Sequence, residues 1–147
     1  GLEARHLKLE ITEQAAVEDA REAARRLEEL SALGVRIALD DFGSGYSALS
    51  YLRTFPVDTL KIDRSFIEGI GRDLQATSIV GAVIALAKSL NMCVTAEGTE
   101  TEEQLAHLRS LGCDLAQGYY FSRPASPEEV ERKLGLARRR RDEPAKR

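Results

Sequence analysis

Apolar and polar residues alternate over five short stretches of the chain, and longer stretches with helical spacing follow them. The alternating stretches predict β-strands at residues 7–11, 35–40, 59–62, 93–96 and 115–117. Helices are expected at residues 18–33, about 47–53, 74–90 and 101–111, with a last helix from about residue 127. Strands that alternate with helices favour parallel pairing through crossover connections. The chain is therefore predicted to be an α/β protein, a partial (β/α) TIM-like barrel of about five βα units.

The period of two within each strand predicts which side chains face the inside of such a barrel. Apolar residues such as Leu7, Leu9 and Leu60 would face the surrounding helices. A polar residue ends each strand: Glu10, Asp40, Lys61, Glu97 and Gln117. Because the carboxyl ends of barrel strands carry the active site in (β/α) enzymes, these side chains are predicted to form one site.

Carboxylates that gather at one barrel mouth repel one another unless cations lie between them. Oxygen ligands select hard cations, so Mg²⁺ or Mn²⁺ is expected. One carboxylate of the pair Asp40-Asp41 could bridge two ions about 3.5–4 Å apart, the spacing used for in-line displacement at phosphorus. Lys61 could orient the attacking water, and Gln117 could hydrogen-bond that water or the ligand. The loop Gly43-Ser44-Gly45 could bring backbone N–H groups close to an anion.

Each residue has a simpler explanation when it is considered alone. An Asp-Asp pair after a strand is more often part of a turn or helix cap than of a metal site. Glu97 before Gly98 can simply end a strand, and a single lysine such as Lys61 is usually solvated. Residues 119–121, all aromatic, could stack on a base or pack against the last helix. Because the charged residues end consecutive strands, a shared site is favoured over these separate explanations.

Length and composition fit one folded domain. A complete (β/α)8 barrel usually needs about 250 residues, and the five units expected in these 147 residues would be roughly five-eighths of one. Hydrophobic residues at 43% and charged residues at 31% are typical of a soluble globular protein rather than a disordered one. No apolar run has the length of about 18 residues that a membrane span needs, and the chain does not open on a secretory signal. Cys93 and Cys113 lack metal-ligand spacing and are expected to be reduced core thiols of a cytoplasmic protein. Residues 137–147 begin with a basic run and are expected to be a disordered tail.

Five motifs occur along the chain in one order: Leu9-Glu10-Ile11-Thr12-Glu13, residues 40–47, Lys61-Ile62-Asp63, residues 96–100 and residues 117–124. In order and spacing they resemble the EAL-domain family, bacterial phosphodiesterases that cleave the second messenger cyclic di-GMP to linear pGpG. The resemblance implies a domain over residues 1–136 with cyclic di-GMP as its ligand. It implies neither DNA nor RNA as a partner.

The resemblance also implies roles for single residues. Glu10 would bind the first metal ion, Asp40 would bridge both ions, and Asp41 would bind the second. Glu97 would bind the second ion or act on its water, and Lys61 would position the hydrolytic water. Asp63 and Gln117 would support that arrangement.

A second group of residues is assigned by the same resemblance to a loop beside the site. The segment from Asp41 through Phe42, Gly43, Ser44 and Gly45 to Ser47 is similar to a family loop that couples dimerisation to metal binding. Glu13 would anchor this loop, and the helix after Gly45 would contribute to a homodimer interface. Glu100 would lie close to the site and either support the residues there or contact the substrate.

The family's Glu-Ala-Leu signature and an asparagine ligand, both expected upstream, do not occur in this chain. The chain is therefore expected to be the C-terminal part of the domain, inactive alone and active when the upstream strands are supplied. An alternative hypothesis is a non-catalytic module for cyclic di-GMP binding or dimerisation. A further one is a fragment that folds only through self-association.

Overall fold

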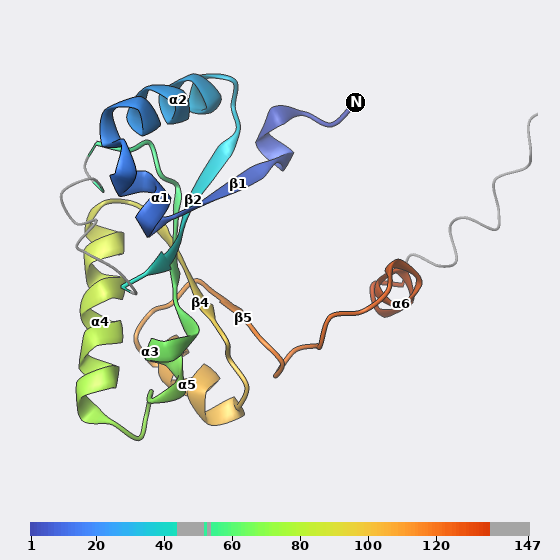
Figure 1. Ribbon diagram of the computed structural model, residues 1–147. Coiled ribbons are helices and arrows are strands. Elements are labelled where there is room, and N and C mark those ends of the chain that lie inside the picture. The colour runs from blue at the N-terminus through green and yellow to red at the C-terminus, as the bar shows by residue number, and fades with distance from the viewer. Residues whose placement is uncertain (44–51, 53, 136–147) are drawn as a thin grey trace, which may run out of the picture.

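Five parallel strands form one sheet in the computed structural model, which describes residues 1–43, 52 and 54–135 (Figure 1). The strands follow one another across the sheet in chain order: β1 (Lys8–Thr12), β2 (Arg36–Phe42), β3 (Thr59–Ile62), β4 (Cys93–Glu97) and β5 (Leu115–Gln117). A 3₁₀ turn (Ala4–His6) and helices α1 (Glu13–Glu18), α2 (Ala20–Ala32), α3 (Arg64–Glu68), α4 (Leu74–Ser89), α5 (Glu102–Ser110) and α6 (Pro127–Lys133) connect or follow them. Every neighbouring pair is parallel, which confirms the predicted α/β class.

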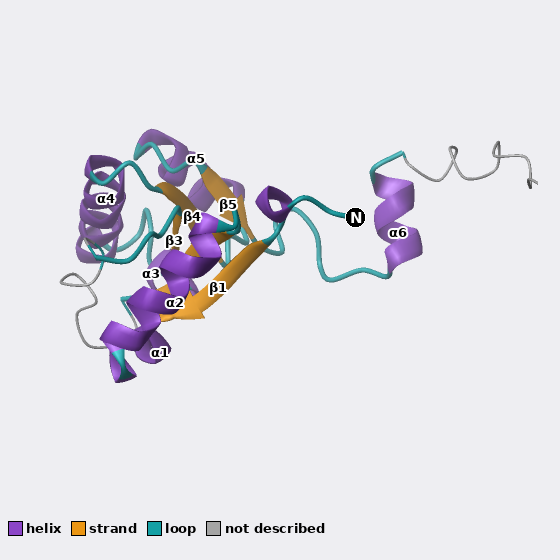
Figure 2. Cartoon of the chain, turned by 90° about the horizontal axis from the view of Figure 1, so that it is seen from above, coloured by secondary structure: helices purple, strands orange, loops and turns teal. Residues whose placement is uncertain are grey.

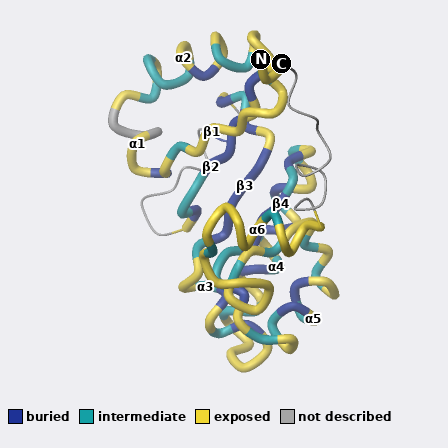
Figure 3. Tube along the Cα trace, turned by 90° about the vertical axis from the view of Figure 1, so that its right-hand side faces the viewer, coloured by how far each residue is buried: buried dark blue, intermediate teal, exposed yellow. Residues whose placement is uncertain are grey.

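The core lies between the outward face of the sheet and the helices that cover it. Ile37, Leu39, Leu60, Ile62 and Val94 are almost completely buried there, as the predicted alternation requires. Figure 3 shows the burial concentrated on β2 and β3. In Figures 1 and 2, α4 packs on one side of the sheet, whereas α6 stands apart from it on the other side.

The outer strands of the sheet are less covered than the sequence predicts. Leu7 is 50% exposed and Leu9 is 37% exposed, although both were expected to pack against helices. The reason is that β1 is an edge strand with β2 as its one neighbour among the described residues. At the other edge, Leu115 of β5 is 51% exposed for the same reason.

Two helical segments differ from the sequence-based expectation. The helix expected over residues 18–33 is α2, whereas α1 was not expected. Asp19 lies between the two helices, and its side chain caps α2 by accepting from Glu22 N–H at 3.1 Å. Helix α3 was not among the expected helices, and the Asp63 side chain caps it by accepting from Ser65 N–H. In both cases a short acidic side chain accepts a hydrogen bond from a free N–H group at the start of a helix.

Aspartate side chains also join neighbouring strands at their amino ends by accepting hydrogen bonds from strand N–H groups. The Asp58 carboxylate, just before β3, accepts a hydrogen bond from Ile37 N–H of β2 at 2.8 Å. The Asp114 carboxylate, just before β5, accepts one from Val94 N–H of β4 at 2.8 Å. Lys88 of α4 also pairs with Asp114. These contacts set the relative position of strands whose carboxyl ends carry the site.

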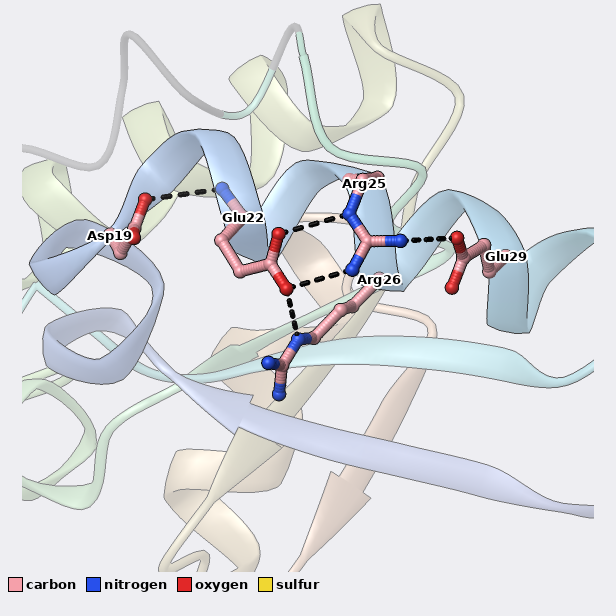
Figure 4. A network of polar contacts seen from close by, with 5 residues as sticks. All are labelled: Asp19, Glu22, Arg25, Arg26 and Glu29. Atoms are coloured by element: carbon pink, nitrogen blue, oxygen red, sulfur yellow. Dashed lines mark hydrogen bonds and ion pairs between the residues drawn. The ribbon is translucent and has the colours of Figure 1, made fainter.

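Helix α2 carries a charge network on its outer face (Figure 4). The Glu22 carboxylate accepts hydrogen bonds from the guanidinium groups of Arg25 at 2.8 and 2.9 Å and Arg26 at 2.7 Å. These bonds lower the pKa of Glu22 to about 2. Arg25 also bonds Glu29 at 2.5 Å, so this network follows the helix surface through neighbouring turns.

The helix expected near residues 47–53 and the tail at 137–147 fall largely outside the described residues. Within the described part of the chain, none of the helices has both the length and the apolar character needed to cross a bilayer.

Candidate active site

Lys61 lies near the carboxyl end of β3, the middle strand, and its side chain is 8% exposed. Its ammonium nitrogen is 2.7 Å from Glu10 Oε2, 3.0 Å from Asp40 Oδ1 and 2.8 Å from Glu97 Oε1. These three carboxylates come from β1, β2 and β4. The ends of four neighbouring strands therefore converge on one ammonium group.

The surroundings of Lys61 determine its charge. Burial disfavours the cation, but hydrogen bonds to Glu10, Glu97 and Asp40 outweigh this effect and raise the pKa of Lys61 above its ordinary value. Lys61 is therefore a permanent cation and hydrogen-bond donor at neutral pH.

Asp40 and Asp41 lie at an irregularity of β2. The register between β2 and β3 shifts between Leu39 and Phe42. Asp41 has a φ of 55°, in the left-handed region that L residues other than Asn and Asp seldom adopt. In a regular strand, consecutive side chains point to opposite faces, whereas a bulge re-aims one of them. Both carboxylates thereby reach the same place.

Asp40, Asp41 and Glu97 form a group with the composition of a metal site. Each offers one carboxylate oxygen, and the three oxygens lie within 4.8 Å of one another. All three side chains are half-buried. An all-oxygen, triply acidic group fits a hard divalent cation rather than a soft one. Glu10 contacts this group through Lys61 and lies outside the three-carboxylate set.

The residues assigned to the neighbouring loop are distributed over the core and the site. Phe42, expected in the loop, is the last residue of β2 and belongs to the hydrophobic core at 8% exposure. Glu13 is buried, and its carboxylate accepts a hydrogen bond from Gly43 N–H at 3.0 Å. Ser44, Gly45 and most of the helix expected to form a dimer interface lie outside the described residues.

The remaining predicted residues border the site. Gln117 of β5 is paired in register with Glu97, and a pocket is lined by Gln117, Glu97, Glu100 and Tyr119 among others. The Asp63 carboxylate instead binds Ser65, through its N–H at 3.0 Å and its hydroxyl at 2.5 Å. It was expected to support the arrangement of metal ligands and Lys61, whereas its observed contacts are those of a helix cap.

Arg64 is a site residue that the sequence analysis did not single out. It lines the same pocket as Glu97 and Gln117, and its guanidinium Nη2 lies 3.1 Å from Glu100 Oε1. Its position directly after the Lys61-Ile62-Asp63 motif was the available signal. The aromatic residues expected to stack or pack are partly exposed, and Arg123 lies 4.6 Å from the Tyr119 ring centroid.

Curated relatives match most of this chain, and the chain matches a small part of each. The cyclic di-GMP phosphodiesterase NbdA of Pseudomonas aeruginosa is 50% identical over 124 residues, which are 84% of this chain and 16% of NbdA. The bifunctional diguanylate cyclase/cyclic di-GMP phosphodiesterase MucR of the same organism is 47% identical over 129 residues, 88% of this chain and 19% of MucR. The chain thus spans less than a fifth of the length of either relative.

Solved structures agree with these matches. The phosphodiesterase of P. aeruginosa MucR in complex with c-di-GMP superimposes with a TM-score of 0.83 at 47% identity, covering 88% of this chain and 52% of that one. BlrP1 of Klebsiella pneumoniae, in a manganese/cy-diGMP complex, gives a TM-score of 0.80 at 35% identity. The match covers 84% of this chain and 32% of BlrP1. The model of the EAL domain matches residues 1–124. With this match over most of its length, and with acidic groups from three strand ends around the lysine of a fourth, the chain belongs to the EAL domain family.

Proposed function

We propose that this chain forms part of a site that hydrolyses cyclic di-GMP to linear pGpG. The observation that carries the proposal is the convergence of Asp40, Asp41 and Glu97 beside the Lys61 ammonium. Relatives named as cyclic di-GMP phosphodiesterases support it. So does the c-di-GMP complex of a structure that shares this fold at 47% identity.

Asp40, Asp41 and Glu97 would hold a divalent cation, proposed to be Mg²⁺ or Mn²⁺, and Glu10 would contribute to a second ion. Such ions, when bound, acidify water and neutralise charge on phosphoryl oxygens. Lys61, whose ammonium nitrogen lies beside Asp40 and Glu97, would donate hydrogen bonds that orient the attacking water or a phosphoryl oxygen. Gln117 and Glu100, which share a pocket with Glu97, would contact the substrate.

The whole protein is proposed to act in the bacterial cytoplasm, where cyclic di-GMP signals. Both cysteines of the chain are free, which is compatible with a reducing compartment. Residues 1–136 are proposed as the part belonging to the phosphodiesterase domain, with strands from outside this chain completing it. The helix after Gly45 is proposed to form a homodimer contact.

The test is a hybrid that joins this chain to the part of the MucR phosphodiesterase outside the matched region. With Mg²⁺ or Mn²⁺ the hybrid is expected to convert cyclic di-GMP to pGpG, measured by chromatography. Asp41→Asn should lose this activity and weaken Mn²⁺ binding by at least about tenfold. Asparagine tolerates the left-handed conformation of Asp41, so the fold should remain.

Glu102→Gln provides the matched control, because Glu102 is an exposed carboxylate in the first turn of α5. It should leave product formation unchanged. A folded hybrid that binds cyclic di-GMP without metal and forms no pGpG would contradict the catalytic proposal. That result would support a binding module instead.

A further inference from the structure

The segment Gly98–Glu100, which follows β4, is held tightly by residues on either side. Thr99 N–H donates to Gln117 O at 3.0 Å, and Tyr120 N–H donates to Thr99 O at 3.0 Å. The contact with Gly118 is so close that a Cβ there would lie 2.1 Å from Thr99 O. On this side, backbone contacts with the β5 loop fix the segment.

Arg64 holds the same segment from the other side. The Gly98 backbone has a φ of +73°, and a Cβ at Gly98 would lie 2.3 Å from Arg64 Cγ and 2.7 Å from Arg64 Cβ. The aliphatic stem of Arg64 therefore packs directly on Gly98. Its guanidinium continues to Glu100 at 3.1 Å and to Glu68 of α3 at 2.9 Å. Arg64 thus links the segment after β3 to the segment after β4.

This contact bears on the acidic group, because Glu97 directly precedes Gly98. The Glu97 carboxylate has an oxygen within 4.8 Å of those of Asp40 and Asp41, and it must stay close to them to share a cation. Glycine has more backbone freedom than any other residue, so an unrestrained Gly98 would let Glu97 change position. Groups that orient metal ligands usually contribute strongly to metal affinity.

We infer that Arg64 is a positioning residue: by packing on Gly98 and pairing with Glu100, it holds the Glu97 carboxylate in place for a divalent cation. The inference rests on the metal site proposed above, and it concerns cation affinity rather than turnover. Arg64 does not itself coordinate the ion, since it is a cation.

The test measures Mn²⁺ binding to the 147-residue chain by calorimetry, with folding checked by circular dichroism. Arg64→Ala is expected to weaken Mn²⁺ binding by about tenfold. Arg64→Lys retains the stem on Gly98 and one charge, but loses the planar fork, so it should recover part of the affinity. Glu100→Gln should also weaken binding, and the double variant Arg64→Ala/Glu100→Gln should bind no more weakly than Arg64→Ala alone.

Two controls separate positioning from general effects of charge and stability. Glu68→Ala removes the i,i+4 pair with Arg64 and leaves Glu100 untouched, so Mn²⁺ affinity should not change. Arg72→Ala removes an exposed guanidinium that lies 3.7 Å from Glu103, and it should likewise have no effect.

Equal Mn²⁺ affinity in Arg64→Ala and the wild type overturns the inference while leaving the metal site intact. The inference is also overturned if Arg64→Ala weakens cyclic di-GMP binding in EDTA but leaves Mn²⁺ binding unchanged. Arg64 would then contact the nucleotide instead of positioning Glu97. If Arg64→Ala does not fold, the inference is tested by the other two variants. It is overturned if Arg64→Lys and Glu100→Gln both bind Mn²⁺ as tightly as the wild type does. Absence of Mn²⁺ binding by the wild-type chain overturns the metal site and the inference together.

Discussion

Lys61 shows how much one residue contributes to the electrostatic balance of this site. Its ammonium group is the shared partner of Glu10, Asp40 and Glu97. Carboxylates at this distance from one another repel when the cation between them is removed. A divalent ion bound to Asp40 and Glu97 would share those carboxylates with Lys61. Lysine and metal therefore interact with the same charges.

Lys61→Met tests this coupling. Without the ammonium, the free energy of unfolding in EDTA should fall by about 2 kcal/mol, an estimate kept low because the carboxylates remain partly hydrated. Mn²⁺ should reverse most of the loss, because it restores positive charge among the same oxygens. Urea unfolding with and without Mn²⁺ measures both effects.

Lys88→Met is the matched control, since Lys88 pairs with the carboxylate of Asp114 far along the strands from the site. It should cost less stability, and Mn²⁺ should not reverse the loss. A Lys61→Met variant whose stability Mn²⁺ leaves unchanged would show that lysine and metal do not share these carboxylates.

At the scale of elements, the strands are aligned by contacts at their amino ends, opposite the site. Asp58 joins β3 to β2, and Asp114 joins β5 to β4, each by accepting a strand N–H at 2.8 Å. The pairing of Glu97 with Gln117 at the carboxyl end depends on the register that such contacts support. These hydrogen bonds at the amino ends thereby contribute to the positions of Glu97 and Gln117 at the carboxyl ends of their strands.

The pH dependence of stability should report the Asp114 contact. The hydrogen bond from Lys88, followed by that from Val94 N–H, lowers the pKa of Asp114 below its usual value. A carboxyl group whose pKa is lower in the folded state stabilises the fold above its unfolded pKa of about 3.9. This stability is lost as the pH falls through the lower, folded value.

Asp114→Asn keeps an oxygen acceptor for Val94 N–H but cannot ionise, so unfolding free energy should depend less on pH below about pH 4 than in the wild type. Glu102→Gln, on exposed α5 surface, should not reduce the slope by the same amount. Equal slopes in Asp114→Asn and wild type would mean that the charge of Asp114 contributes nothing to folding.

The whole molecule presents two open sheet edges, at β1 and β5, within its described residues. Partly exposed apolar side chains lie beside them, including Leu7, Leu9 and Leu115. Unpaired strand edges with apolar neighbours favour pairing with another chain. In solution, the isolated chain is therefore expected to self-associate through these edges.

The expected result is a melting temperature that rises with protein concentration, measured by calorimetry. Leu9→Lys places a charge on the β1 edge and should weaken the dependence. Leu74→Lys, at an 87% exposed position at the start of α4, should leave it unchanged. A melting temperature independent of concentration, with a monomer at all concentrations, would contradict this expectation.

Much of the fold could be predicted from sequence because it depends on local patterns. The period of two in residues such as Leu60, Lys61 and Ile62 separates the core face from the site face, and the structure agrees. Helix α1 before Asp19 and helix α3 after Asp63 were missed, since both are short and a single capping residue is a weak signal. The exposure of Leu9 was missed because alternation does not indicate whether a strand lies at an edge.

The sequence by itself determined the order of strands and helices and which strand ends carry charge, because both follow from periodicity and residue type. Only the tertiary structure decided that Asp41 turns to the side of Asp40, that Lys61 binds carboxylates from three other strands, and that Arg64 packs on Gly98. These features depend on strand register, a bulge and contacts between residues far apart in the chain. Such distances are set by packing the whole sheet, and no local pattern encodes them.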